Sequence, residues 1–179
     1  AEIKVVDEDG KELPTGEVGE ILIKSGNNMK SYWNRPEATE ESIVDGWFYS
    51  GDAGYFDEEG FIYIHDRVKD MIVSGGENIY PAEVENALMS HDDILDAAVV
   101  GIPDDNWGES VKGFVVLKEG VELKEDDIIS YVRTQIAGYE CPKSINYLNE
   151  LPRNPSGKIL RREIRAPFWE GKDRNISGN

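Results

Sequence analysis

Hydrophobic and polar positions follow a strand-like pattern over the first third of the chain. Short apolar or alternating runs are separated by turn sequences rich in Gly, Pro and Asp, which is typical of β-strands joined by tight connections. A short helix is expected to start at Pro36, because proline suits the first turn of a helix. Strands are expected over residues 3–6 and 18–24, and a hairpin over residues 55–65.

The pattern changes after residue 65, where strand-like and helix-like segments alternate. Pro81 opens a stretch with acidic residues in its first turn and apolar residues at helical spacing. Apolar residues also fall on one side of an amphipathic helix expected over residues 125–136. Further helices are expected over 81–90 and 160–166, and strands over 94–102, 111–117 and 144–148. The fold class is therefore α+β, with a β-rich segment over residues 1–65 and a small α/β domain over 66–179 whose short sheet is flanked by helices.

Composition narrows the possible partners and compartments. The chain has 179 residues and a net charge of −17, which argues against a nucleic-acid partner because such partners need a basic surface. No apolar run approaches the length of a transmembrane segment, and no signal peptide is recognised. The single cysteine, Cys141, cannot form an internal disulfide, so a cytoplasmic location is expected. The chain begins with Ala inside a strand-like run, which favours a piece of a longer protein.

One segment of this acidic chain is basic. It could meet a phosphate, or it could be a solvated helix face, and for its arginines we favour the solvated face. The basic residues are Arg153, Lys158, Arg161, Arg162 and Arg165, against Glu163 as the acidic residue of the segment.

Two polar residues in loops could carry chemistry. Asp52 follows a glycine at an expected turn, where a carboxylate can accept hydrogen bonds from two vicinal hydroxyls or simply bond its own backbone. Lys158 lies on a Pro-Ser-Gly loop, and an ammonium there could bridge a carboxylate and a phosphate as charge builds. A lone exposed lysine is more often only a solubilising charge.

Other motifs are open to two interpretations. Gly75-Gly76 is either a hairpin turn or a place where a narrow ligand runs along the backbone. The charged pair Arg67 and Lys69 suits a hinge, and the alternative is a surface salt bridge that contributes about 0–1 kcal/mol. No phosphate-cradling P-loop is present, since Gly157-Lys158 is followed by Ile159. No spacing indicates a metal site or a Ser/His/Asp triad.

Three segments, in their order along the chain, resemble the closing motifs of the acyl-adenylate-forming (AMP-binding) superfamily. They are Tyr49-Ser50-Gly51-Asp52, the stretch from Asp66 to Pro81, and Asn154-Pro155-Ser156-Gly157-Lys158. The sequences of these motifs are most similar to those of fatty-acid–CoA ligases. The resemblance covers the whole chain but only the last third of such an enzyme. It implies that residues 1–65 are the last β-rich piece of a large domain, and that residues 66–179 are a mobile lid.

The resemblance also implies roles for individual residues. Asp52 and Arg67 would contact the ribose of ATP or AMP, Lys69 would be the hinge, and Lys158 would be the catalytic lysine of adenylation. Gly75 and Gly76 would line a tunnel for the pantetheine arm of coenzyme A, and Trp107 and Tyr139 would contact coenzyme A. The sequence departs from the family pattern at Ser50, Asp66 and Cys141, and the last departure puts nucleotide contacts on that side in doubt.

The implied reaction joins a carboxylate to ATP, giving an acyl-adenylate and pyrophosphate, and then transfers the acyl group to coenzyme A. Mg²⁺ would arrive with ATP rather than bind a site in this chain. The acyl pocket and the phosphate loop of the family would lie in a missing N-terminal domain, so the isolated chain is expected to be inactive. Two alternatives remain: an adenylation domain that loads a carrier protein, and a free-standing lid that acts as a binding or regulatory module.

Overall fold

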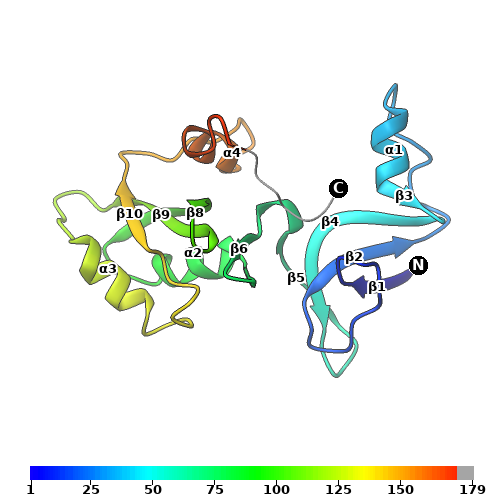
Figure 1. The fold of residues 1–179 in the computed structure, drawn as a ribbon, viewed down its shortest axis with the longest axis horizontal. Helices are drawn as coiled ribbons and strands as arrows, with labels where there is room; N and C mark the ends of the chain where they lie inside the picture. The colour runs from blue at the N-terminus through cyan, green and yellow to red at the C-terminus, as the bar shows by residue number, and fades with distance from the viewer. Residues whose placement is uncertain (173–179) are drawn as a thin grey trace. The chain divides into compact units, whose positions relative to one another are not determined.

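The computed structural model describes residues 1–172, and the chain divides into two compact units between Lys69 and Asp70 (Figure 1). The fold is mixed α+β, as predicted, with one five-stranded sheet in each unit. By this division Asp66, Arg67 and Lys69 lie in the first unit. Within the described residues, no helix has the length and apolar character needed to cross a membrane.

The first unit is an antiparallel sheet with one short helix. β4 is its central strand, with β2 along one edge and β3 and β5 along the other, while β1 pairs with the outer edge of β2. Helix α1 begins at Pro36, as expected from its proline. The elements are β1 (Glu2–Val6), β2 (Gly19–Lys24), α1 (Pro36–Ser42), β3 (Ile43–Val44), β4 (Trp47–Phe56) and β5 (Ile62–Arg67).

The expected turn at Asp52 is wrong, because Ser50, Gly51 and Asp52 lie inside the long strand β4. Gly51 has φ of +71°, and the pairing of β2 with β4 shifts register between Glu20 and Leu22. A residue with positive φ beside a register shift bends and twists a strand without reversing it. The Ser-Gly signal therefore marks an irregularity in a strand rather than its end.

The second unit is built on a mixed sheet. β8 and β9 form a long antiparallel hairpin, β10 runs parallel to β9, and β6 pairs with β7 and, at one position, with β9. Strands were predicted at the places of β8, β9 and β10, and these predictions are confirmed. The strands are β6 (Ile72–Ser74), β7 (Glu77–Ile79), β8 (Ile94–Asp104), β9 (Gly108–Leu117) and β10 (Ser144–Tyr147).

Both faces of this sheet are covered. Successive side chains of a strand point to opposite faces, so Ala97 and Val99 join one buried cluster while Ala98 and Val100 join another. The first cluster includes residues of α2 (Pro81–Met89) and α3 (Glu125–Val132), and the second includes residues of α4 (Arg161–Arg165) and the turn η2 (Ala166–Phe168). Burial on both faces explains why β8 reads as a nearly continuous apolar run.

Helix α3 is shorter than the predicted segment 125–136. Ile128 and Val132 are fully buried on its inner side, as the pattern indicated. After Val132 the amides of Thr134 and Gln135 donate to carbonyls three residues back, which tightens the chain into turns and ends the helix. Ile136 still packs against the cluster from this turn.

One five-residue turn occurs three times among residues 1–172. In each copy a side-chain oxygen of the first residue accepts the N–H groups of the third and fifth residues. The fourth residue is a glycine with φ between +78° and +85°, and its N–H donates to the carbonyl of the first residue. Such a tight turn followed by a left-handed glycine is a common hairpin connection. The three copies are Asp7–Lys11, Asp57–Phe61 and Asn154–Lys158.

Candidate functional site

Asp52 and Arg67 lie opposite each other on β4 and β5. The Arg67 Nε is 3.0 Å from Asp52 Oδ1, and Arg67 Nη1 donates to the carbonyl of Ser50 at 3.3 Å. The two side chains are 32% and 49% exposed, Asp52 being the less exposed. An ionised carboxylate has about four lone-pair sites, so the pairing through Oδ1 leaves Asp52 able to accept hydroxyl donors as well. The structure thus joins two residues that the sequence assigned to one ligand.

Hydrogen bonds fix the backbone that carries Asp52. The Ser50 hydroxyl donates to the carbonyl of Ile21 at 2.7 Å and accepts the Asp52 N–H at 3.1 Å. Glu20 Oε1 accepts the Gly51 N–H at 3.0 Å. Burial raises the pKa of the Glu20 carboxyl, the Gly51 N–H opposes this, and the negative charge of Asp52 adds to the increase. This corner of the sheet therefore holds two carboxyl groups, Glu20 and Asp52, with the Arg67 guanidinium paired to Asp52.

Gly75 and Gly76 form the two-residue turn of the β6–β7 hairpin, so the turn interpretation is confirmed. Their φ values of +64° and +89° are those of a type I′ turn, which glycine adopts readily. The Gly75 N–H donates to the carbonyl of Trp107 at 2.9 Å. A Cβ placed on Gly75 would lie 2.5 Å from Trp107 Cε3, whereas one on Gly76 would meet nothing within 4 Å. The missing side chain at Gly75 is thus what admits the indole ring.

Trp107 and Tyr139 are both surface aromatics, 58% and 50% exposed. Trp107 lies in the β8–β9 connection, where Asp104 Oδ1 accepts its N–H at 3.1 Å. The pKa of the Tyr139 phenol is raised, chiefly by the negative charge of Glu140 and further by desolvation and by Glu77. Glu77 directly follows Gly76, so Tyr139 is within electrostatic reach of the same hairpin. Gly75 and Trp107 are therefore in direct contact, and the charge of Glu77 beside this hairpin contributes to the raised pKa of Tyr139.

Lys158 is the fifth residue of the third turn. Asn154 Oδ1 accepts its N–H at 2.9 Å, and its side chain is exposed. Arg153 reinforces the turn, because its Nη1 donates to the carbonyl of Gly157 at 2.6 Å and its Nη2 contacts Asp96 Oδ2 at 2.6 Å. Among residues 1–172, the Lys158 ammonium has no hydrogen-bond or ion-pair partner.

The interpretation of the arginines as a solvated face is wrong for Arg161. Its guanidinium binds both carboxylate oxygens of Glu85, at 3.0 and 2.6 Å, and its side chain is only 21% exposed. Its Nη1 also lies 3.8 Å from Asp70 Oδ2, and Glu85 Oε1 accepts the N–H of Val99 at 2.8 Å. Arg161 therefore connects α4, α2 and the first residue of the second unit. Lys69 precedes Asp70 in a short 3-10 turn (Val68–Asp70) and is exposed.

Sequence reasoning missed Asn154 and Arg153 as structural partners of the lysine loop, and Arg161 as the partner of Glu85 and Asp70. For Asn154 a signal existed, because the spacing of an Asx residue and a glycine recurs at Asp7 and Asp57. For Arg161 no local signal existed, since its partner Glu85 lies 76 residues away.

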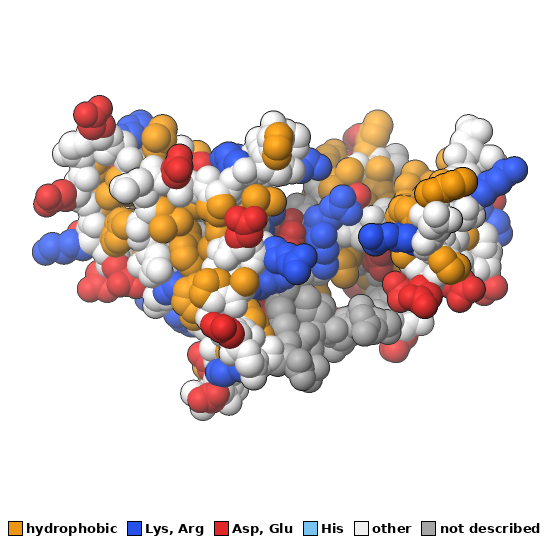
Figure 2. All heavy atoms as spheres, turned by 90° about the horizontal axis from the view of Figure 1, so that it is seen from above, with side chains coloured by type: hydrophobic (Ala, Val, Ile, Leu, Met, Phe, Trp, Pro, Cys, Tyr) orange, Lys and Arg blue, Asp and Glu red, His pale blue; other side chains and the backbone are white. Residues whose placement is uncertain are grey.

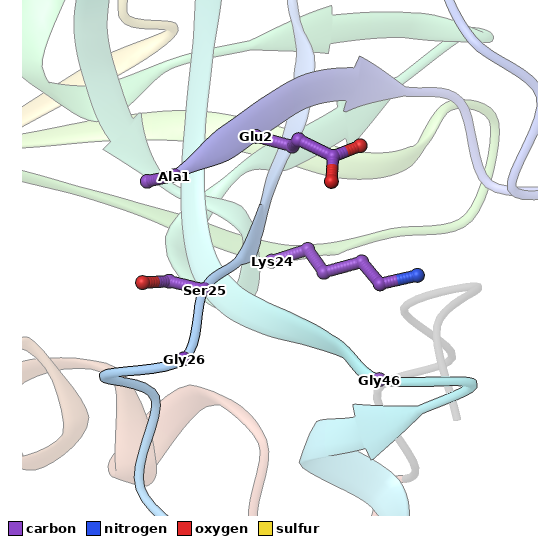
Figure 3. A pocket seen from close by; sticks show the side chains of 6 residues that line it. All are labelled: Ala1, Glu2, Lys24, Ser25, Gly26 and Gly46. Carbon is purple, nitrogen blue, oxygen red and sulfur yellow. The ribbon is translucent and has the colours of Figure 1, made fainter.

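The part of the chain that the structure describes has no group of three or more His, Cys, Asp or Glu placed to hold a metal ion. A shallow hollow near Lys24 and Gly46 contains none of the candidate residues (Figure 3). Acidic side chains reach the surface over both units (Figure 2), in keeping with the net charge of −17.

Residues 83–158 match the family model described as the AMP-binding enzyme C-terminal domain. The chain is 46% identical to fatty acid–[acyl-carrier-protein] ligase ScoC of Streptomyces coeruleorubidus, over 97% of this chain and 34% of that ligase. It is 47% identical to feruloyl-CoA synthase of an Amycolatopsis species, over 93% of this chain and 34% of that enzyme.

A solved structure of o-succinylbenzoate CoA synthetase from Bacillus subtilis, in complex with an acyl-adenylate intermediate, is similar in fold. Its TM-score is 0.84 at 44% identity, over 91% of this chain and 33% of that one. The chain thus spans about a third of the length of the relatives it matches. Residues 83–158 thus match an AMP-binding enzyme C-terminal domain, and the chain as a whole is similar to the C-terminal part of adenylate-forming acyl ligases.

Proposed function

We propose that this chain is the C-terminal part of an ATP-dependent carboxylate–CoA ligase whose acyl substrate is a fatty acid. The ligase activates the carboxylate as an acyl-adenylate and then transfers the acyl group to the thiol of coenzyme A. The phosphate loop, the acyl pocket and the site for Mg²⁺ bound with ATP belong to an N-terminal domain that completes the enzyme. The chain by itself does not form acyl-adenylate, and the enzyme works in the cytoplasm.

The observation that carries this proposal is the Lys158 turn. An ammonium that has no partner among the described residues stands on a loop whose backbone is fixed by Asn154 and Arg153. Residues 151–162 contain no Asp or Glu, although the chain as a whole has a net charge of −17. A preset cation of this kind stabilises negative charge that builds on a phosphate and carboxylate during adenylation, without reorganisation at the moment of reaction.

The other candidate residues have complementary roles. Asp52 accepts the ribose hydroxyls of the nucleotide while Arg67 holds its carboxylate and contacts the same ribose. The Gly75-Gly76 hairpin lines the path of the pantetheine arm, with Trp107 and Tyr139 contacting coenzyme A beside it. Because the lysine and the hairpin are needed in different steps, the second unit turns as a lid about Lys69 between the two half-reactions.

The test compares two lysines in equivalent turns. In the full-length enzyme, Lys158→Ala should reduce carboxylate-dependent ATP–pyrophosphate exchange by about 100- to 1000-fold, the usual loss for one electrostatic donor. It should spare thioester formation from supplied acyl-adenylate. Lys11→Ala removes the lysine at the same place of the Asp7–Lys11 turn and should change neither step. Equal losses in both steps for Lys158→Ala, or exchange activity of the 179-residue chain alone, would contradict the proposal.

A second candidate function is loading of a carrier protein. It is favoured by the 46% identity to a ligase named for an acyl-carrier-protein substrate. Purified enzyme should be given its acyl-adenylate with either coenzyme A or a carrier protein bearing a phosphopantetheine arm. A higher kcat/KM for coenzyme A supports the first function, and a higher value for the carrier supports the second. The same assay with a fatty acid and an aromatic acid tests the acyl group.

A further inference from the structure

The Asp7–Lys11 and Asn154–Lys158 turns share one pattern of hydrogen bonds but differ in charge. Their four backbone and side-chain hydrogen bonds correspond one to one, and both end in a lysine. The first three residues of the two turns differ in charge. They are Asp7, Glu8 and Asp9 in the first turn, and Asn154, Pro155 and Ser156 in the other.

The turn itself does not need an amide at its first position. Asp7 and Asp57 accept the same two N–H groups through a carboxylate oxygen, at 2.9–3.0 Å, and a charged acceptor makes the stronger bond. Asn154 accepts its two N–H groups at 3.0 and 2.9 Å with a neutral oxygen. For turn formation alone, Asp would serve at least as well as Asn.

The absence of charge on the Asn154 side chain matters for Lys158. A carboxylate at position 154 would place one negative charge on the side chain whose oxygen accepts the Lys158 N–H. That charge would attract the Lys158 ammonium and repel an incoming phosphate or carboxylate. Arg153 adds to the contrast, because its guanidinium binds the carbonyl of Gly157, and the corresponding positions before the other turns are Val6 and Phe56.

We propose that Asn154 is a positioning residue for Lys158: it builds the turn in uncharged form, so that the lysine remains available to an anionic reactant. The inference rests on the proposed function of Lys158 and extends it to the residue that frames the loop. Asn154 need not touch the substrate, because it acts through the backbone of Lys158 and through the absence of charge.

The test is Asn154→Asp in the full-length enzyme, with the reverse exchange Asp7→Asn as the matched control. Asn154→Asp should keep the melting temperature, since two Asp-based turns already exist in this chain. It should reduce ATP–pyrophosphate exchange about tenfold and spare thioester formation from supplied acyl-adenylate. The exchange activity should partly recover at high salt, because salt screens an exposed charge. Asp7→Asn should leave both steps unchanged.

Full exchange activity in folded Asn154→Asp would overturn the inference, and so would a loss that is equal in both steps or insensitive to salt. If Asn154→Asp does not fold, Ser156→Asp places the charge where Asp9 carries it in the other turn, and the same outcomes apply. Lys158→Ala, measured alongside, separates this inference from the proposed function. If Lys158→Ala retains pyrophosphate exchange, the proposed function is wrong. If Lys158→Ala loses exchange while Asn154→Asp keeps it, only this inference is wrong.

Discussion

Asp52 and Arg67 are cross-strand partners, with the Arg67 Nε 3.0 Å from Asp52 Oδ1. Both side chains are partly exposed, and ion pairs of this kind add only about 0–1 kcal/mol to stability. The value of the pair therefore lies in orientation, because each residue holds the other in place before a ligand arrives. Such preorganisation reduces the entropy lost on binding.

Asp52→Asn tests this relationship. The amide keeps the shape of the side chain but loses the charge that attracts Arg67 and accepts hydroxyl donors. We expect the KM for ATP to rise about tenfold or more, as charged hydrogen bonds contribute about 1.5–3 kcal/mol, while the melting temperature changes little. Steady-state kinetics and thermal unfolding of the full-length enzyme measure both. Glu58→Gln, an exposed change in the β4–β5 connection, is the control. An unchanged KM for ATP would remove Asp52 from the nucleotide site.

Lys69→Pro tests the hinge. Proline fixes φ near −65° and removes the N–H group, so we expect one half-reaction to survive and the other to fall. Lys69→Ala removes the same side chain but leaves the backbone free, and it should preserve both. The two half-reactions are measured separately, by pyrophosphate exchange and by thioester formation. If the proline variant performs both, the chain pivots elsewhere.

Gly76→Leu and Gly76→Ala form a matched pair for the pantetheine path. Both place a side chain at φ of +89°, which costs about 1–2 kcal/mol, and neither Cβ meets another atom. The melting temperatures should therefore fall together. Only leucine adds bulk, so it should suppress thioester formation while adenylation persists. Gly75 is unsuitable for this test, because its Cβ would displace Trp107. Equal rates of thioester formation in the two variants would mean that Gly76 serves only the hairpin turn and does not line the pantetheine path.

Cys141 provides a pH-dependent prediction. Burial raises the pKa of its thiol, so the folded state holds this proton more tightly than the unfolded state does. The resulting stability is present below the unfolded pKa of about 8.5 and is lost as the pH rises above it. We expect the free energy of unfolding to decline more steeply with pH above 8.5 in the natural chain than in Cys141→Ala. Denaturant titrations at several pH values measure the slopes, and parallel slopes would contradict the prediction.

Local patterns were sufficient for most elements. Proline at residue 81 and the spacing of Val84 and Leu88 predict α2, and the apolar runs of β8 and β9 predict strands, because these signals lie within each segment. The same reasoning failed at Gly51, because the sequence alone does not distinguish a glycine that bends a strand from a glycine that ends one. The difference depends on pairing with β2, which lies elsewhere in the chain.

The candidate site was predictable in part for the same reason. The residues that carry chemistry stand in short motifs, and their identities follow from resemblance to a family rather than from periodicity. The residues that hold them are not local: Asp96 reaches Arg153 from 57 positions away. Such ion pairs form only in the completed fold. When each segment is considered separately, their residues are therefore interpreted as surface charges.

The contacts of Arg161 and Trp169 carry a consequence for the order of assembly. Arg161 bonds Glu85 across 76 residues, and Trp169 Nε1 donates to the Gly101 carbonyl across 68. On a ribosome the partners emerge first, and the sheet that contains Gly101 can form while the last segment is still being made. The stretch that bears Lys158 then docks after the sheet has formed, through Arg153 before the lysine and Arg161 and Trp169 after it. We expect a nascent chain stopped before residue 161 to contain the Lys158 turn but not the Arg161 and Trp169 contacts that hold the following segment on this unit.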